Sequence, residues 1–132
     1  MDEPLPATWD WVTARAQCSA RAFFERLALG AQQNVTTRVA LLPSGAVAPR
    51  DVVRVATHGT SFAVFTEATP GPTVRVRLDG PRIVVAREDG LESFAGTVTL
   101  DDTGRCRLRV GAEALDEWQV LKRALEPVLF PE

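Results

Sequence analysis

The stretch TVRVRLDGPRIVVA, residues 73–86, decides the fold of this chain. Its first half places an apolar residue at every second position, at Val74, Val76 and Leu78. A period of two is typical of a β-strand that buries one face and exposes the other. Asp79-Gly80 is a dipeptide that tight hairpins favour, and the proline after it lacks an N–H donor, so we expect that proline to begin the next strand. The stretch therefore predicts two antiparallel strands joined by a short turn.

The same alternation recurs in short runs on both sides of this hairpin. We expect strands near residues 35–41, 53–55, 62–66, 74–78, 83–85, 94–100 and 106–110. Short strands joined by tight turns pair antiparallel, because parallel pairs need long crossover connections. Clean alternation also indicates that only one face of the sheet is buried.

Helical spacing replaces this alternation at both ends of the chain. Apolar residues three and four apart predict a first helix over residues 8–29, with Gly30 at its C-terminal cap. A second helix is predicted over about Ala112–Glu126, and Pro127 is expected to stop it.

These elements predict an α+β fold: an N-terminal helix, an antiparallel meander of about six to seven strands, and a C-terminal helix. We favour an open two-layer sandwich, because two amphipathic helices are available to cover one face of the sheet. The alternative is a small curled barrel capped by the C-terminal helix. Residues 1–7 are expected to be a tail, and residues 8–132 a single globular domain.

Composition limits the classes of protein that this chain can represent. It has 132 residues, a formal net charge of -2 and 45% hydrophobic residues, which is ordinary for a globular domain. No run approaches the roughly 18 apolar residues of a membrane span, and the acidic start lacks the features of a secretion signal. We therefore expect a soluble cytoplasmic protein without membrane contact. The net charge also disfavours a nucleic-acid partner.

The basic residues are almost all arginine. Lysine and arginine together number 15 and Lys122 is the only lysine, which leaves 15 - 1 = 14 arginines. Together with frequent alanine, valine, glycine and proline, this bias is typical of a GC-rich, bacterial-like genome.

The two cysteines, Cys18 and Cys106, lie far apart and have no metal-binding spacing. We expect a pair of buried thiols, with a disulfide as the alternative if the fold brings them together. We expect no bound metal and no cofactor.

The sequence favours a protein that is not an enzyme. His58 is the only histidine and lies in a predicted turn, and no glycine-rich phosphate-binding loop is present. The paired carboxylates Glu88-Asp89 and Asp101-Asp102 both lie in predicted turns, where aspartate is favoured for backbone reasons. If the protein were an enzyme, His58 together with a carboxylate from another strand would be the candidate catalytic pair.

Two groups of arginines mark a candidate binding surface. Arg75 and Arg77 share the solvent face of one strand, and Arg105, Arg107 and Arg109 share that of another. Alternate residues of a strand lie about 7 Å apart, so the arginines of each group repel one another unless an anion compensates them. That anion is either a carboxylate on a neighbouring strand, a protein partner, or a phosphate or nucleic-acid ligand.

A second candidate surface is apolar. The first helix carries a wider apolar surface than one neighbour can cover, and an apolar tail follows the second helix. The residues expected to mediate self-association are Trp11, Leu29, Val128, Leu129 and Phe130.

The favoured function is a small non-enzymatic interaction or accessory protein that forms a homodimer or binds another protein. One alternative is a small-ligand binder with a pocket between sheet and helices, lined by Trp9, Phe62, Phe94 and Trp118. The other is an anion or nucleic-acid binder that uses the arginine-rich strands.

Overall fold

A computed structural model of the protein describes residues 10–42, 52–68, 72–87 and 92–130. Its helices are α1 (Trp11–Gln17), α2 (Ala20–Ala40) and α3 (Glu117–Leu129). Its strands are β1 (Val53–His58), β2 (Ser61–Thr66), β3 (Thr73–Asp79), β4 (Arg82–Arg87), β5 (Glu92–Leu100), β6 (Cys106–Val110) and β7 (Glu113–Leu115). The predicted tail, residues 1–7, lies outside the described residues.

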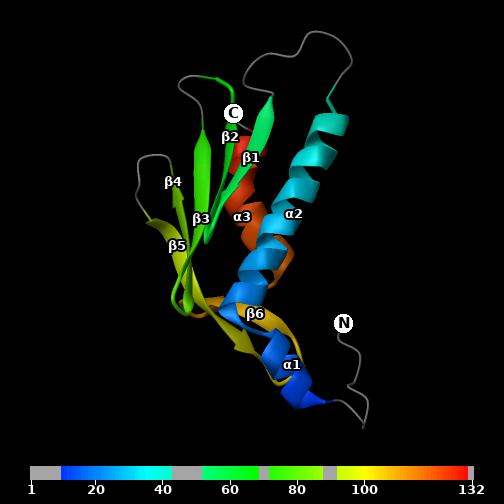
Figure 1. The fold of residues 1–132 in the computed structure, drawn as a ribbon, viewed down its shortest axis with the longest axis vertical. Helices are drawn as coiled ribbons and strands as arrows, with labels where there is room; N and C mark the ends of the chain where they lie inside the picture. The colour runs from blue at the N-terminus through cyan, green and yellow to red at the C-terminus, as the bar shows by residue number, and fades with distance from the viewer. Residues whose placement is uncertain (1–9, 43–51, 69–71, 88–91, 131–132) are drawn as a thin grey trace.

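The strands form one antiparallel sheet in the order β1-β2-β3-β4-β5-β6-β7, and this sheet does not close into a barrel. Figure 1 shows α2 and α3 lying against the sheet, while α1 extends from the lower end of the molecule. The predicted α+β sandwich is confirmed.

The hairpin from which the fold was predicted is present. Asp79 pairs with Arg82, so the two residues between them form the turn. Gly80 has a φ of +59°, a backbone conformation that favours glycine. Pro81 lies in the turn instead of beginning the strand, and β4 begins one residue later.

The prediction of a single first helix over residues 8–29 is wrong. The helical region breaks at Cys18, and Ser19 begins α2 by accepting a hydrogen bond from the Ala22 N–H (3.0 Å) on its Oγ. Asp10 caps α1 in the same way, accepting from the Val12 N–H at 3.0 Å. The break redirects the chain, because α1 buries no residue whereas α2 packs on the sheet.

The predicted strand at residues 35–41 is also wrong, because these residues form the last turns of α2 and the residue after it. Residues Thr36 to Val39 satisfy a period of two, but Val35 also continues a four-residue spacing from Leu27 and Ala31. All three of these apolar side chains are buried. Because a helix buries Val35 together with Leu27 and Ala31 against the sheet and α3, these residues form a helix and not a strand.

Gly30 lies inside α2 and does not cap a helix as predicted. A Cβ at this position would lie only 2.7 Å from Cδ1 of Leu121 on α3. The glycine thus allows the two helices to pack closely.

The C-terminal helix begins and ends later than predicted. Residues Glu113–Leu115 form β7 beside β6, and α3 follows Asp116, whose N–H donates to Oε1 of Gln119 at 2.8 Å. Pro127 lies inside the last turn of α3 and does not stop it. A proline so near the helix end removes one backbone hydrogen bond, and the burial of the apolar residues after it offsets that loss. The sheet has seven strands, but β7 replaces the predicted strand at 35–41.

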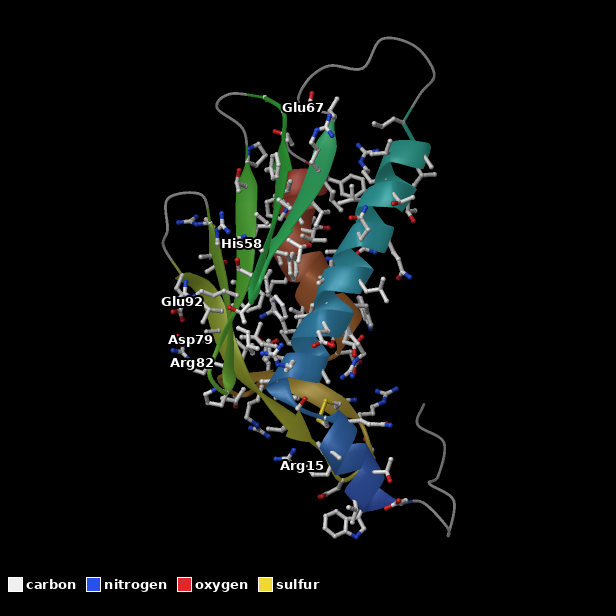
Figure 2. The ribbon with its side chains drawn as sticks, viewed as in Figure 1. Arg15, His58, Glu67, Asp79, Arg82 and Glu92 are labelled. Atoms are coloured by element: carbon white, nitrogen blue, oxygen red, sulfur yellow. A yellow bond between two sulfur atoms is a disulfide. The ribbon has the colours of Figure 1, made fainter. Side chains whose placement is uncertain are left out.

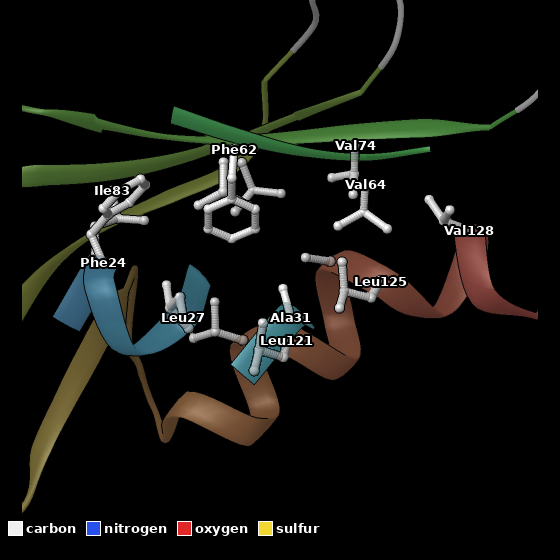
Figure 3. Packing of buried hydrophobic residues seen from close by; sticks show 14 of the residues in the cluster. Phe24, Leu27, Ala31, Phe62, Val64, Val74, Ile83, Leu121, Leu125 and Val128 are labelled. Atoms are coloured by element: carbon white, nitrogen blue, oxygen red, sulfur yellow. The ribbon is translucent and has the colours of Figure 1, made fainter. Parts of the chain in front are cut away.

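The hydrophobic core fills the space between the sheet and the two longer helices (Figure 3). Every second residue of the central strands points into it, including Phe62, Val64, Val74 and Val76. Helix α2 contributes Phe23, Phe24, Leu27, Ala31 and Val35, and α3 contributes Val120, Leu121, Ala124, Leu125, Val128 and Leu129. Both helices lie on one side, and no helix of the described ranges covers the opposite face of the sheet.

Cys18 and Cys106 form a disulfide, with their Cα atoms 5.4 Å apart. The expectation of two buried thiols is therefore wrong. The bond joins the turn between α1 and α2 to the start of β6, and it is the yellow bond in Figure 2. The break in the first helix places Cys18 at this contact.

Candidate functional site: the outer face of the sheet

We call the surface of the sheet that points away from α2 and α3 the outer face. Strand alternation places six arginines on it: Arg54, Arg75, Arg77, Arg82, Arg107 and Arg109. In Figure 2, Arg82 lies with Asp79 and Glu92 on the side of the sheet away from α2. The arginines therefore come from β1, β3, β4 and β6.

Small side chains lie between these arginines. In register, Arg75 has Ala63 on one side and Ala86 on the other, and Arg77 lies beside Val84. Ala63, Val84 and Ala86 are only 5%, 1% and 5% exposed although no helix covers this face. The register places Arg75, Arg77 and Phe65 beside them as the larger side chains of this face, and arginine can bury its methylene groups while its charge stays in water.

Three of the six arginines have a carboxylate partner, and Arg107, described below, is one of them. Arg54 forms an ion pair with Glu67, and Arg82 forms one with Glu92 at 3.4 Å. Arg75, Arg77 and Arg109 are exposed and make no ion pair or hydrogen bond with any residue in the described ranges. The outer face thus carries three arginines whose charges the described part of the fold leaves uncompensated.

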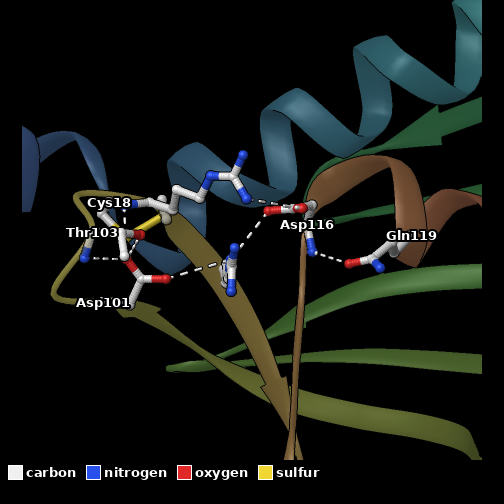
Figure 4. Close-up of polar contacts among 8 residues, drawn as sticks. Cys18, Asp101, Thr103, Asp116 and Gln119 are labelled. Carbon is white, nitrogen blue, oxygen red and sulfur yellow. Dashed lines mark hydrogen bonds and ion pairs between the residues drawn. A yellow bond between two sulfur atoms is a disulfide. The ribbon is translucent and has the colours of Figure 1, made fainter. Parts of the chain in front are cut away.

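Arg105 and Arg107 have a structural role instead (Figure 4). Nε of Arg107 lies 3.4 Å from Asp101 and 3.2 Å from Asp116, and Arg105 lies 3.8 Å from Asp116. These contacts tie β6 to the residue that begins α3. The five arginines predicted as one binding surface are therefore divided between an ion-pair network and an uncompensated set.

Asp101 belongs to this network and also organises the turn between β5 and β6. Its Oδ1 accepts hydrogen bonds from the N–H of Thr103 (2.9 Å), the Thr103 hydroxyl (2.6 Å) and the Arg105 N–H (3.0 Å). Partial burial alone would raise the pKa of this carboxyl. The hydrogen bonds from Thr103 and Arg105, together with the charge of Arg107, outweigh burial and hold the Asp101 pKa below its ordinary value.

This pKa shift predicts a loss of stability in acid. Because the folded-state pKa is below the unfolded value of about 3.9, ionised Asp101 stabilises the fold above that pH, and the contribution is lost as the pH falls through the folded-state pKa. We expect Asp101→Asn to be less stable at neutral pH and to lose less stability between about pH 4 and pH 2. Urea unfolding at each pH measures both effects. Asp102→Asn is the matched control, because Asp102 is exposed and accepts none of these hydrogen bonds. If that variant also lost less stability between about pH 4 and pH 2, to the same extent, Asp101 would not be the cause of the acid sensitivity.

The candidate catalytic residue His58 ends β1 and is exposed. Its backbone carbonyl accepts a hydrogen bond from the Ser61 hydroxyl at 3.2 Å, and its imidazole makes no hydrogen bond or ion pair with the residues that the structure describes. Neither cysteine can serve as its nucleophile while the two form a disulfide. Within residues 10–42, 52–68, 72–87 and 92–130, no cluster of acidic, histidine or cysteine side chains could hold a metal ion.

The apolar residues predicted to mediate self-association do not form one patch. Val128 and Leu129 are 2% and 8% exposed and belong to the core, so their assignment to a contact surface does not hold. Trp11, Leu29 and Phe130 are exposed, but they lie on α1, on α2 and after the end of α3. The burial of the two core residues follows from the continuation of α3 through Pro127.

The predicted ligand pocket is not formed by the residues expected to line it. Phe62 is fully buried in the core, Trp118 is 62% exposed, and Trp9 lies outside the described residues. Phe94 packs against the core with the Arg123 guanidinium 5.8 Å from its ring centre. The one sizeable depression that includes Trp118, of about 570 Å³, lies beside the disulfide, between α1, β6 and the start of α3.

Sequence reasoning missed the partners of the arginines. The sequence places Asp101 in a predicted turn and Asp116 in the predicted second helix, but it gives no signal of which carboxylate meets which arginine. Only the strand register and the position of α3 bring them to β6.

Comparison with known proteins identifies no relative: no protein-family model, no curated protein and no solved structure matches this chain. Among the helices of the described ranges, none has the length and apolar character needed to cross a membrane. The fold and the outer face alone therefore indicate the class of protein.

Proposed function

We propose that this protein is a non-enzymatic binding module that recognises an acidic segment of a protein partner through the outer face of its sheet. One observation carries the proposal. Arg75, Arg77 and Arg109 have no carboxylate partner in the described ranges, while Arg54 and Arg82 on the same face each have one. Uncompensated arginines on a face without helical cover are suited to bind carboxylates from another molecule.

The spacing of Arg75 and Arg77 suits an extended peptide. Two residues apart on β3, they project from the same face at an interval of about 7 Å. Acidic side chains at alternate positions of an extended peptide repeat at the same interval, so each carboxylate can accept both hydrogen bonds of one guanidinium. Arg109 lies three strands further along the sheet, roughly 14 Å away across the strands, where it can contact a second part of the partner.

An acidic peptide fits this face better than a nucleic acid does. Binders of single strands combine basic groups with aromatic side chains on which bases stack. Phe65 lies on this face opposite Arg54 and is half-buried, whereas the residues directly beside Arg75 and Arg77 in register are Ala63, Ala86, Ser61 and Val84, none of them aromatic. The formal net charge of -2 also opposes general attraction to a polyanion.

Replacing both β3 arginines tests the proposal. We expect the double variant Arg75→Gln/Arg77→Gln to bind a labelled twelve-residue peptide of alternating glutamate and serine about tenfold more weakly, since two exposed ion pairs contribute roughly 1–2 kcal/mol together. Glutamine keeps part of the stem that shields the alanines. Fluorescence anisotropy at low salt measures the affinity, and circular dichroism shows whether the fold is kept.

Arg21→Gln on α2 is the control, because Arg21 is also an exposed arginine but lies in the helical layer. Its affinity for the peptide should equal that of the unchanged protein, and binding should weaken with added salt. Lack of peptide binding by the unchanged protein contradicts the proposal. Tighter binding of a single-stranded oligonucleotide of equal charge would favour the nucleic-acid alternative instead.

The disulfide is relevant to the cellular compartment of the protein. Disulfides persist in oxidising compartments and are rare in the cytoplasm, where thiols are kept reduced. The Cys18–Cys106 bond therefore favours an oxidising compartment over the cytoplasmic location expected from the sequence. Thiol titration of the protein isolated from its native cells without reductant tests this point, and two free thiols per chain would contradict it.

A further inference from the structure

We propose that two copies of this chain join edge to edge through β1, so that their two sheets form one continuous antiparallel sheet. This inference concerns β1 and does not rest on the function proposed for the arginines of β3 and β6. It follows from the backbone groups that β1 leaves without a partner in the described part of the chain.

The two edges of the sheet differ. The β7 edge is only three residues long and runs directly into α3 through Asp116. The β1 edge is six residues long, pairs with β2 at all six positions, and contains no proline, lysine or bulge. Proline, lysine and bulges are among the features with which proteins protect an edge strand from pairing. The one charged residue of β1, Arg54, is compensated by Glu67, so β1 is the edge better suited to accept another strand.

The hydrogen bonds to β2 show which backbone groups point outward. The Val52 carbonyl accepts from the Glu67 N–H at 3.0 Å, which places residue 52 among those whose backbone groups face β2. In an antiparallel pair, these positions alternate with positions whose N–H and C=O face the other way. Val53, Val55 and Thr57 therefore direct their N–H and C=O groups to the open edge.

One register satisfies all of these groups. If a two-fold axis passes beside Val55, this residue pairs with Val55 of the second copy. Val53 then pairs with Thr57 of the second copy, and Thr57 pairs with Val53 of the second copy. Three donors from each copy then form 3 + 3 = 6 backbone hydrogen bonds. Shifting the register by two residues leaves outward groups at the end of each strand unpaired.

The side chains are compatible with this register. Val53 and Val55 point toward the helical layer, so both copies place their helices on the same side of the joined sheet, and Val55 packs against its copy. On the outer face, Arg54 lies opposite Ala56 of the second copy, so no like charges meet across the junction. Glu67 already compensates Arg54. The edge is thus complementary to itself in hydrogen bonding, shape and charge, which is why we assign a second copy as its occupant.

The oligomeric state tests the inference directly. The full chain has a mass of 14.4 kDa, so the dimer has 2 × 14.4 = 28.8 kDa. Sedimentation equilibrium over a range of concentrations should show the dimer at high concentration. The amide protons of Val53, Val55 and Thr57 should exchange more slowly as the protein concentration rises, whereas those of Arg54 and Ala56 should be protected at every concentration by β2.

A charge introduced at one exposed position tests the dimer contact without disturbing the fold of the monomer. Ala56 is exposed on the outer face and lies opposite Arg54 of the second copy in this register. We expect Ala56→Arg to raise the dissociation constant of the dimer about tenfold and Ala56→Glu to lower it several-fold, with both monomers equally folded by circular dichroism. Val55→Pro, which removes an outward N–H but no bond to β2, should give a monomer.

Three outcomes would overturn the inference: a monomer at every concentration, a dimer that responds identically to the two Ala56 substitutions, or edge amides whose protection does not depend on concentration. Because Ala56 is not one of the arginines proposed to bind peptide, loss of the dimer with unchanged peptide affinity would leave the proposed function intact.

Discussion

Replacing Cys18 and Cys106 together by alanine is expected to lower the free energy of unfolding by about 4–5 kcal/mol. The disulfide joins residues 88 apart in sequence. In the chain-entropy description, closing a loop of that length restricts the unfolded chain by about 4.6 kcal/mol at 25 °C. For a domain of this size, such a loss corresponds to a fall in Tm of roughly 15 °C.

The expected loss has a local component as well. Helix α1 buries no residue, so the disulfide at its C-terminal end is its main attachment to the sheet. Alanine is preferred to serine in this test because Cys18 is only 3% exposed, and a hydroxyl there would be buried without a partner.

Urea unfolding of the oxidised protein, the reduced protein and the double variant measures the effect. The reduced protein and the variant should be destabilised to a similar extent, and adding reductant to the variant should change nothing. Equal stability of the oxidised and reduced proteins would show that the bond does not restrain the unfolded chain as described.

Gly96→Ala is expected to destabilise the protein by about 3 kcal/mol. A Cβ on Gly96 would overlap the backbone carbonyl oxygen of Arg109 and would lie 3.0 Å from Cγ of Leu108. Both neighbours belong to β6, which pairs with β5 on the opposite side from β4. Since the closest atom is backbone, relief requires β5 and β6 to move apart.

Gly30→Ala is the matched control for this substitution. A Cβ at Gly30 would meet only Cδ1 of Leu121, the end of a flexible side chain. Alanine also favours the helix over glycine by about 1 kcal/mol. We therefore expect a change much smaller than that of Gly96→Ala, measured by the same urea unfolding. Similar losses in both variants would contradict the close approach of β5 and β6 as the cause.

Both predictions concern the attachment of β6. This strand is held by the disulfide at Cys106, by the close contact at Gly96, and by the ion pairs of Arg107. It also carries Arg109, one of the three uncompensated arginines of the outer face. A loosened β6 would therefore displace Arg109 while leaving Arg75 and Arg77 on β3 in place.

Much of the sheet was predictable from the sequence because its strands alternate strongly. In β3, buried and exposed residues follow the period of two, whereas β2 and β4 bury residues on both faces of the sheet. Short turns leave few ways to connect the strands. The turn at Asp101–Gly104 was predicted too, and the Gly104 N–H donates to the Asp101 carbonyl at 3.1 Å. The exposure of Arg75 and Arg77 followed from the same alternation.

The ends of the elements were not predictable in this way. Residues 35–41 fit both a strand and a helix, and residues 113–115 are too few to show a period. In both places, the neighbouring structure decides: α3 and the sheet hold the end of α2, and β6 provides a partner for β7.

The amino-acid sequence by itself determined that this chain forms an antiparallel meander covered by helices on one face, because local alternation and turn residues specify strands without reference to distant residues. Only the tertiary structure decided that Cys18 meets Cys106, that Arg105 and Arg107 are paired while Arg75, Arg77 and Arg109 have no partner in the described ranges, and that β1 is an edge strand of the sheet. The disulfide, the ion pairs and the position of β1 all depend on which residues far apart in the chain become neighbours. The packing of α2 and α3 on the sheet determines those neighbours.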